Sequence, residues 1–323
     1  MKKLFCVMLT VLMIVSLFAG CGSKADDGVI NVAIIQQLDH SSLDEIRLAA
    51  QAQLDKIAAE KGIKVEYKHF NGQNDTSILA QIGTQVVSDG YDLILPIATL
   101  AAQYAVTAAE GKDIPIVYAA VSDPAGAGLT GMPTVTGVSD ALNTPFIMDM
   151  MFAADPDIQT VGLLYSLSEP NSEVPIQEAK AYLDAKGIPY IEKTGNTADE
   201  VITAATALVG RCDAVFTPTD NAIMNVAPSV AEILAGAGIA HYTGADSFVQ
   251  AGSFATCGVN YTELGTYAAT MAMDIALGGA VPEFHVMDGG IITINTNTAD
   301  ALGLDYSVFN TMANTVLAVT STQ

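Results

Sequence analysis

The most regular feature of the chain is a short apolar run that ends abruptly in polar side chains. The clearest run covers residues 114–121, is rich in β-branched side chains and is followed directly by Ser122 and Asp123. A run of this length and composition is typical of a buried parallel strand. Because ligands of open sheets bind where the carboxyl ends of parallel strands meet, we predict an α/β protein whose polar strand ends line one crevice.

The first half of the chain alternates such strands with helices. One helix is predicted to begin with a capping box formed by Ser42 and Glu45 and to end at Gly62. Residues 126–131 match the pattern GxGxxG, but the segment after them is extended, so we interpret them as a loop and not as a dinucleotide site. Strands are predicted at residues 29–35, 65–69, 93–97 and 114–121.

From residue 137 the same alternation starts again. The runs at residues 161–165, 213–217 and 239–243 repeat earlier ones at a spacing of about 125 residues, which indicates two lobes of one topology. A further helical pattern and two short strand-like runs close the chain, so we expect it to cross between the lobes near Asp140 and near Tyr261, where a hinge would lie. The predicted lobes are residues 29–139 with 261–288 and residues 140–260 with 289–323.

The first residues have the form of an export signal. Lys2 and Lys3 precede an apolar run at residues 4–18, which is shorter than the roughly 20 residues of a membrane span. Residues 17–21 resemble the lipobox of bacterial lipoproteins, and this resemblance implies that Cys21 carries a lipid in the mature chain. We therefore expect a signal peptide at residues 1–20 and a tether at residues 21–28.

Charge and cysteine content narrow the possible partners. Acidic residues outnumber basic ones by 35 to 13, and the resulting net charge of −22 argues against nucleic acid as a partner. Cys212 and Cys257 can pair in an exported chain, but we favour two buried thiols. The 4 histidines are scattered and neither HExxH nor CxxC occurs, so we expect no metal site and no cofactor.

Several segments together resemble a known family. They are residues 97–103, 113–124, 135–140, 169–172 and 219–221. They resemble the type I periplasmic binding proteins, and more narrowly the substrate-binding lipoproteins of ABC transporters that include tryptophan-binding and tyrosine-binding members. The resemblance implies two Rossmann-like lobes with parallel sheets, a ligand in the cleft between them, an ABC permease with its ATPase as partners, and an extracytoplasmic, lipid-anchored location without catalysis.

The polar strand ends supply the candidate ligand-binding residues. A free amino acid presents an ammonium and a carboxylate, and the two arginines, Arg47 and Arg211, are poorly placed to bind the carboxylate. Hydroxyls and helix N-termini are the alternative donors, and Asp123 and Asp220 are predicted to face each other so that one binds the ammonium. The full set is Gln37, His40, Thr99, Ser122, Asp123, Tyr165, Glu169, Asn171, Ser172, Asp220, Asn221 and Asp246.

Structural roles remain open for several of these residues. Ser172, Asn221 and Ser247 also suit helix N-caps, and Asp123 before Pro124 also suits a turn. Glu169 can be a rim charge and His40 a loop residue, and the methionines at positions 148, 150 and 151 suit a core better than a cofactor site.

The predicted ligand is a small amine-bearing solute, most of all an apolar or aromatic amino acid. Tyr104, Phe146 and Tyr165 are the aromatic residues expected to line its side chain. A sugar or nucleoside receptor of the same fold is the alternative. An exported hydrolase is the third reading, but no GxSxG occurs, and only the pair Asp123 and Asp220 suits a glycosidase.

Overall fold

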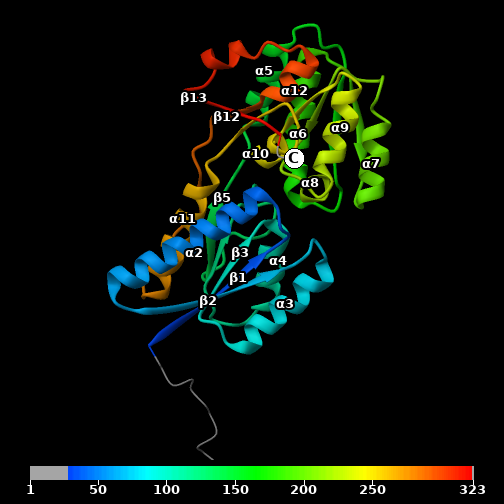
Figure 1. Cartoon of the computed structure of the whole chain (residues 1–323). Coiled ribbons are helices and arrows are strands. Elements are labelled where there is room, and N and C mark those ends of the chain that lie inside the picture. The colour runs from blue at the N-terminus through cyan, green and yellow to red at the C-terminus, as the bar shows by residue number, and fades with distance from the viewer. Residues whose placement is uncertain (1–27, 322–323) are drawn as a thin grey trace, which may run out of the picture.

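A computed structural model describes residues 28–321 of the chain. In it the chain forms two α/β lobes, one above the other, each built around its own mostly parallel sheet (Figure 1). The predicted signal peptide, Cys21 and all of the predicted tether except Gly28 lie outside the described residues.

Lobe one is built on a six-stranded sheet whose neighbouring strands are all parallel. Its strands are β1 (Val29–Gln36), β2 (Lys64–Asn71), β3 (Leu93–Ile97), β4 (Ile116–Ala119), β5 (Val135–Ser139) and β11 (His285–Val286). They lie in the order β11-β5-β4-β3-β1-β2, and β3, β4 and residues 32–35 of β1 consist of buried apolar residues because helices cover both faces. Residues 126–131 form a loop, as predicted.

The helices of lobe one are α2 (Ser41–Lys61), α3 (Thr76–Asp89), α4 (Thr99–Ala108) and α11 (Tyr261–Ala276). Helix α2 buries a face that contains Leu43, Ile46, Ala50, Leu54 and Ile57, and it ends before Gly62, which has a left-handed φ of 65°. Helix α11 runs along α2 (Figure 1), and Gly265 permits this approach because a Cβ there would lie 2.3 Å from the backbone oxygen of Ile46.

The predicted capping box of α2 is wrong. The N-cap position is His40, whose side chain makes no capping hydrogen bond. The hydroxyl of Ser42 donates instead to Asp246 of lobe two, and Glu45 accepts from the backbone N–H of Thr262. Both side chains therefore connect distant segments and do not cap their own helix.

Lobe two is built on a seven-stranded sheet in the order β13-β12-β10-β9-β8-β6-β7. The strands are β6 (Val161–Tyr165), β7 (Tyr190–Thr194), β8 (Ala214–Thr217), β9 (Ala240–Thr243), β10 (Ala255–Gly258), β12 (Ile291–Asn295) and β13 (Thr315–Val319). The helices are α5 (Thr144–Ala154), α6 (Glu173–Lys186), α7 (Ala198–Thr206), α8 (Asn221–Met224), α9 (Ala227–Gly236), α10 (Asp246–Gln250) and α12 (Thr296–Leu302), with 3₁₀ helices at Pro170–Ser172 and Ser307–Thr311. Strands β10 and β12 pair antiparallel, which is a departure from the parallel pattern expected.

The chain passes between the two sheets three times, after β5, after β10 and after β11. The three methionines of α5 are fully buried, as predicted, and Cys212 and Cys257 are free and buried, as favoured from the sequence. Within residues 28–321, no helix has both the length and the apolar character needed to cross a membrane.

Candidate functional site

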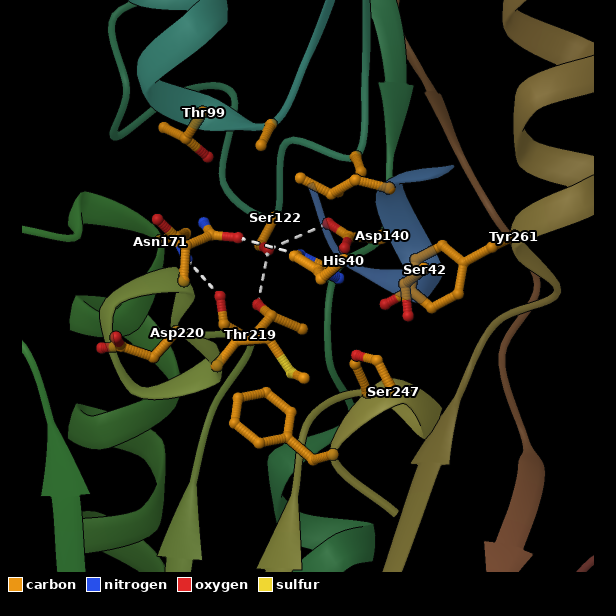
Figure 2. Close-up of a pocket in the computed structure, with 17 residues that line it drawn as sticks. His40, Ser42, Thr99, Ser122, Asp140, Asn171, Thr219, Asp220, Ser247 and Tyr261 are labelled. Atoms are coloured by element: carbon orange, nitrogen blue, oxygen red, sulfur yellow. Dashed lines mark hydrogen bonds between the residues drawn. The ribbon is translucent and has the colours of Figure 1, made fainter. Parts of the chain in front are cut away.

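A pocket lies between the two lobes, at the carboxyl ends of their strands (Figure 2). Lobe one contributes the ends of β3 and β4 and the start of α2. Lobe two contributes the segments that follow β6, β8 and β9, and Tyr261 closes the pocket from the start of α11.

Two alanines at the ends of β3 and β4 have unusual backbone conformations. Ala98 has a φ of 77° and Ala120 a φ of 55°, and residues other than glycine rarely adopt such values. Both residues line the pocket. Strain of this kind is concentrated at functional sites, and here it directs the chain so that α4 begins with Thr99 in the pocket wall.

Asp140 is the buried acid on the lobe-one side of the pocket. It follows β5, and its carboxylate accepts a hydrogen bond of 2.9 Å from the hydroxyl of Ser122. The desolvation that accompanies burial raises the pKa of Asp140. Asp140 was missed as a ligand-binding candidate, although it stands at the predicted hinge.

Asp220 is the corresponding acid on the lobe-two side, and it is saturated with donors. One oxygen accepts from the backbone N–H of Ser166 at 2.6 Å and from the hydroxyl of Ser172 at 2.7 Å, and the other accepts from the N–H of Ile223 at 3.0 Å. Burial nevertheless raises the pKa of Asp220. The third bond makes Asp220 the N-cap of α8, while the side chains of Ser172 and Asn221 do not act as N-caps.

Glu169 joins the two lobes. It accepts hydrogen bonds of 2.9 Å from the side-chain amides of Gln37 in lobe one and Asn221 in lobe two. Burial, and then the negative charge of Asp220, raise the pKa of Glu169 to about 8. Glu169 is therefore a buried connection between the lobes and not a rim charge.

Three further hydrogen bonds cross the cleft. His40 Nε2 lies 3.3 Å from Asn221 Oδ1, and Ser42 donates to Asp246 at 2.9 Å. The hydroxyl of Ser122 also lies 3.2 Å from that of Thr219. The two lobes are thus in direct contact around the pocket, as in a closed arrangement.

The pocket holds an unusual share of unsatisfied polar atoms. Eight buried side-chain atoms of the described residues lack a hydrogen-bond partner, and four of them belong to residues that line this pocket. They are His40 Nδ1, Thr99 Oγ1, Asn171 Oδ1 and Ser247 Oγ. Leaving such atoms unpaired costs roughly 1 to 3 kcal/mol each, so the pocket favours a ligand that supplies partners.

The charges of the pocket are all of one sign. Asp140 and Asp220 line it, Glu169 lies buried and Asp246 half-buried behind it, and no Lys or Arg of the described chain is among the lining residues. Arg47 instead pairs with Asp44 at 2.9 Å. Burial lowers the pKa of His40 to about 4, so this imidazole is neutral near pH 7. The pocket therefore lacks a positive charge that a cationic group of the ligand can provide.

The structure brings together most of the predicted site residues. His40, Thr99, Ser122, Asn171, Asp220 and Asn221 line the pocket, and Glu169, Ser172 and Asp246 hydrogen-bond to residues that line it. Gln37 lies one step further from the pocket, where it hydrogen-bonds to Glu169 and to the N–H of Leu100 at the start of α4.

Two predicted site residues lie elsewhere. Asp123 accepts from the N–H of Gly126 in a turn, so it does not face Asp220 across the pocket. The hydroxyl of Tyr165 donates to Glu192 on the neighbouring strand β7. Tyr104 and Phe146 line other surface hollows, and the aromatic residues of the pocket are Phe248 and Tyr261. Within residues 28–321, no group of three His, Cys, Asp or Glu residues is arranged to hold a metal ion.

Two lobes with sheets of this kind and a polar pocket between them define a type I periplasmic binding protein. An ABC sugar transporter subunit from Rhodobacter sphaeroides has the same fold at 14% identity, with a TM-score of 0.63 over 83% of this chain and 98% of that one. The family model described as ABC transporter substrate binding protein matches residues 31–312, and the chain belongs to that family.

Three relatives are more similar in sequence. A tyrosine-binding protein from Clostridioides difficile is 30% identical over 322 residues, which is 94% of this chain and 93% of that protein. An ABC domain from Streptococcus pneumonia, solved in complex with L-Trp, is 29% identical with a TM-score of 0.82, and the match covers 89% of this chain and 99% of that one. A ligand-free, open structure of a substrate-binding protein with adhesive properties from Clostridium difficile is 30% identical, and its TM-score is 0.68 over 90% and 99% of the two chains. The higher score against the complex agrees with the hydrogen bonds that join the lobes here.

Proposed function

We propose that this protein is the extracytoplasmic solute receptor of an ABC importer and that it binds a free amino acid with an aromatic or other apolar side chain. The observation that carries the proposal is the pocket itself, whose buried acids have no basic partner among the lining residues and which contains four unpaired polar side-chain atoms. A zwitterionic ligand with an ammonium group supplies the missing charge and the missing hydrogen bonds.

Asp140 is the proposed partner of the ammonium. Asp140 accepts from the hydroxyl of Ser122 and from its own backbone N–H, whereas Asp220 accepts from one hydroxyl and at least two backbone N–H groups and Glu169 from two side-chain amides. The unpaired carbonyl oxygen of Asn171 is the second acceptor offered to the ammonium. Its amide orientation is fixed because the NH₂ group donates to the backbone carbonyl of Thr219.

The start of α4 is the proposed site for the carboxylate. The hydroxyl of Thr99 is buried without a partner, and Ala98 at the N-cap position has no side chain that can cap the helix. The N–H of Leu100 already donates to the side-chain oxygen of Gln37 at 3.2 Å, so the hydroxyl of Thr99 is the side-chain donor left for the carboxylate. A helix N-terminus attracts anions through its N–H groups and through its dipole. Donors and partial positive charge thus replace the arginine that the pocket lacks.

The remaining wall suits an aromatic side chain. Leu43, Met224, Ala245, Phe248 and Tyr261 line it, and all but Met224 are buried. The tyrosine-binding relative and the neighbour solved with L-Trp support this choice of ligand class.

The ligand is tested by fluorescence. The chain contains 0 Trp residues, so emission excited selectively at the indole band comes from added L-tryptophan. Enclosure in the cleft is expected to shift this emission and to increase its anisotropy, and thermal unfolding should move upwards with tryptophan or tyrosine. If neither emission nor anisotropy changes and tyrosine and phenylalanine leave the melting temperature unchanged, a nucleoside or sugar becomes the better ligand.

The proposal includes a location and partners for the protein in transport. We expect the ligand to be returned chemically unchanged, a lipid on Cys21 to anchor the chain, and an ABC permease with its ATPase to receive the ligand. Mass spectrometry of the protein purified from membranes is expected to find the mature N-terminus at a lipid-modified Cys21. An unmodified N-terminus at another residue would refute the anchor.

A further inference from the structure

Ser247 is a buried hydroxyl with no structural role in its own helix. It lies in the first turn of α10, but the N-cap position belongs to Ala245, and no side chain caps this helix. Only 2% of Ser247 is exposed, and its Oγ has no hydrogen-bond partner. The N-cap role considered for Ser247 from the sequence is therefore wrong, and another reason for a hydroxyl at this position is needed.

The position of Ser247 in the pocket suggests that reason. Figure 2 shows Ser247 on the side of the pocket away from Thr99 and Asn171. Phe248, which follows Ser247, and Ala245, two positions before it, both belong to the apolar wall of the pocket. The adjacent acid, Asp246, already accepts from Ser42, so Ser247 is the unpaired polar group next to this wall.

We infer that Ser247 determines which aromatic amino acid is bound, by forming a hydrogen bond with a polar group at the far end of the ligand's side chain. This inference rests on the proposed function, in which the ammonium and carboxylate are held by Asp140 and Thr99. A hydroxyl both donates and accepts, so it can pair with the O–H of tyrosine or accept from the N–H of tryptophan. Phenylalanine leaves Ser247 unpaired inside a closed pocket.

The expected selectivity follows from the cost of that unpaired group. A site built to bond a buried hydroxyl or N–H rejects the analogue that lacks it, because the site's own buried polar group is then left unpaired. The dissociation constant of phenylalanine should exceed that of tyrosine, tryptophan or both by about tenfold or more in the wild-type protein.

The test compares ligands across matched variants by isothermal titration. In Ser247→Ala the preference for tyrosine or tryptophan over phenylalanine should fall to about twofold or less, while phenylalanine itself binds as before or more tightly. Thr144→Val is the control, because Thr144 is also the first-turn residue of a helix, α5, and its buried hydroxyl also lacks a partner, but it does not line the pocket. This variant should keep the wild-type preference.

Several outcomes would overturn the inference. Wild-type protein that binds phenylalanine as tightly as both tyrosine and tryptophan rejects it without any variant. A preference that persists in Ser247→Ala also rejects it, and loss of that preference in His40→Gln would then assign selection to the unpaired Nδ1 of His40. If none of the three amino acids binds the wild-type protein, the proposed function fails instead, and the inference fails with it.

Discussion

Two buried carboxylates on opposite sides of the cleft differ in how completely their oxygens are satisfied. Asp220 of lobe two accepts from Ser166, Ser172 and Ile223, and so belongs to a finished hydrogen-bond network. Asp140 on the side of lobe one accepts from the hydroxyl of Ser122 and from its own backbone N–H. Equal burial thus conceals two different roles, since one acid holds its own lobe together and the other remains available to a ligand.

The largest effect expected from this difference is on ligand affinity. Asp140→Asn removes the charge that the ammonium needs, and a buried charge deprived of its partner costs about 3 to 5 kcal/mol. Affinity for the amino acid should therefore fall more than about a hundredfold in calorimetric titration. Asp123→Asn is the matched control, because Asp123 lies in a turn outside the pocket. Similar affinities for the two variants would remove Asp140 from the site.

Asp220 should show the opposite behaviour, with its main effect on stability. Asp220→Ala leaves the buried N–H groups of Ser166 and Ile223 without acceptors, at about 1 to 3 kcal/mol for each orphaned group. The free energy of unfolding without ligand should drop by about 3 kcal/mol in urea titration. Asp140→Asn should change that free energy little, and equal destabilisation by both variants would contradict the comparison.

The sequence predicted the fold because its signals are local. Apolar runs and helical spacing depend on neighbours within one element, and β1, β3, β4, β6, β8 and β9 lie where such runs occur. The carboxyl ends of parallel strands then bring distant residues to one edge whatever the details of packing. This explains why His40, Thr99, Ser122, Asn171, Asp220 and Asn221 were predicted and do line one pocket.

The errors arose where the partner of a side chain is distant in sequence. Asp123 and Asp140 both follow a strand, and the choice between them depends on the turn at Gly126. Ser42 matched a capping box but bonds a residue 204 positions away. Tyr165 is the last residue of β6, but its hydroxyl donates to Glu192 of β7 because β7 pairs with β6.

Relieving the backbone strain at Ala98, in the lobe-one wall of the pocket, should have a smaller effect and should stabilise the protein. Ala98 has a φ of 77° and a ψ of 162°, a conformation that is accessible almost only to glycine. Ala98→Gly should therefore raise the free energy of unfolding by about 1 kcal/mol, after the larger entropy loss of glycine is subtracted. Ala245→Gly on the lobe-two wall, where φ is −143°, should lower it instead. A loss of stability in both variants would show that the conformation of Ala98 is unstrained.

The smallest expected effect is a proton released on binding. Burial and Asp220 raise the pKa of Glu169 to about 8, so in the empty cleft this group is mostly protonated at pH 7 and ionises as the pH rises. Its contribution to stability is complete below its unfolded value of 4.5 and is lost as the pH rises through about 8. A bound ammonium favours the ionised form of Glu169, so binding releases a fraction of a proton into the buffer. The affinity for the ligand should therefore increase with pH up to about 8, by at most about tenfold per pH unit. Titrations at pH 7 in buffers of different ionisation enthalpy should detect this proton in the wild-type protein. The dependence of the binding heat on the buffer should disappear in Glu169→Gln. If the binding heat of the wild-type protein does not depend on the buffer, the charge of the ligand does not change the protonation of Glu169.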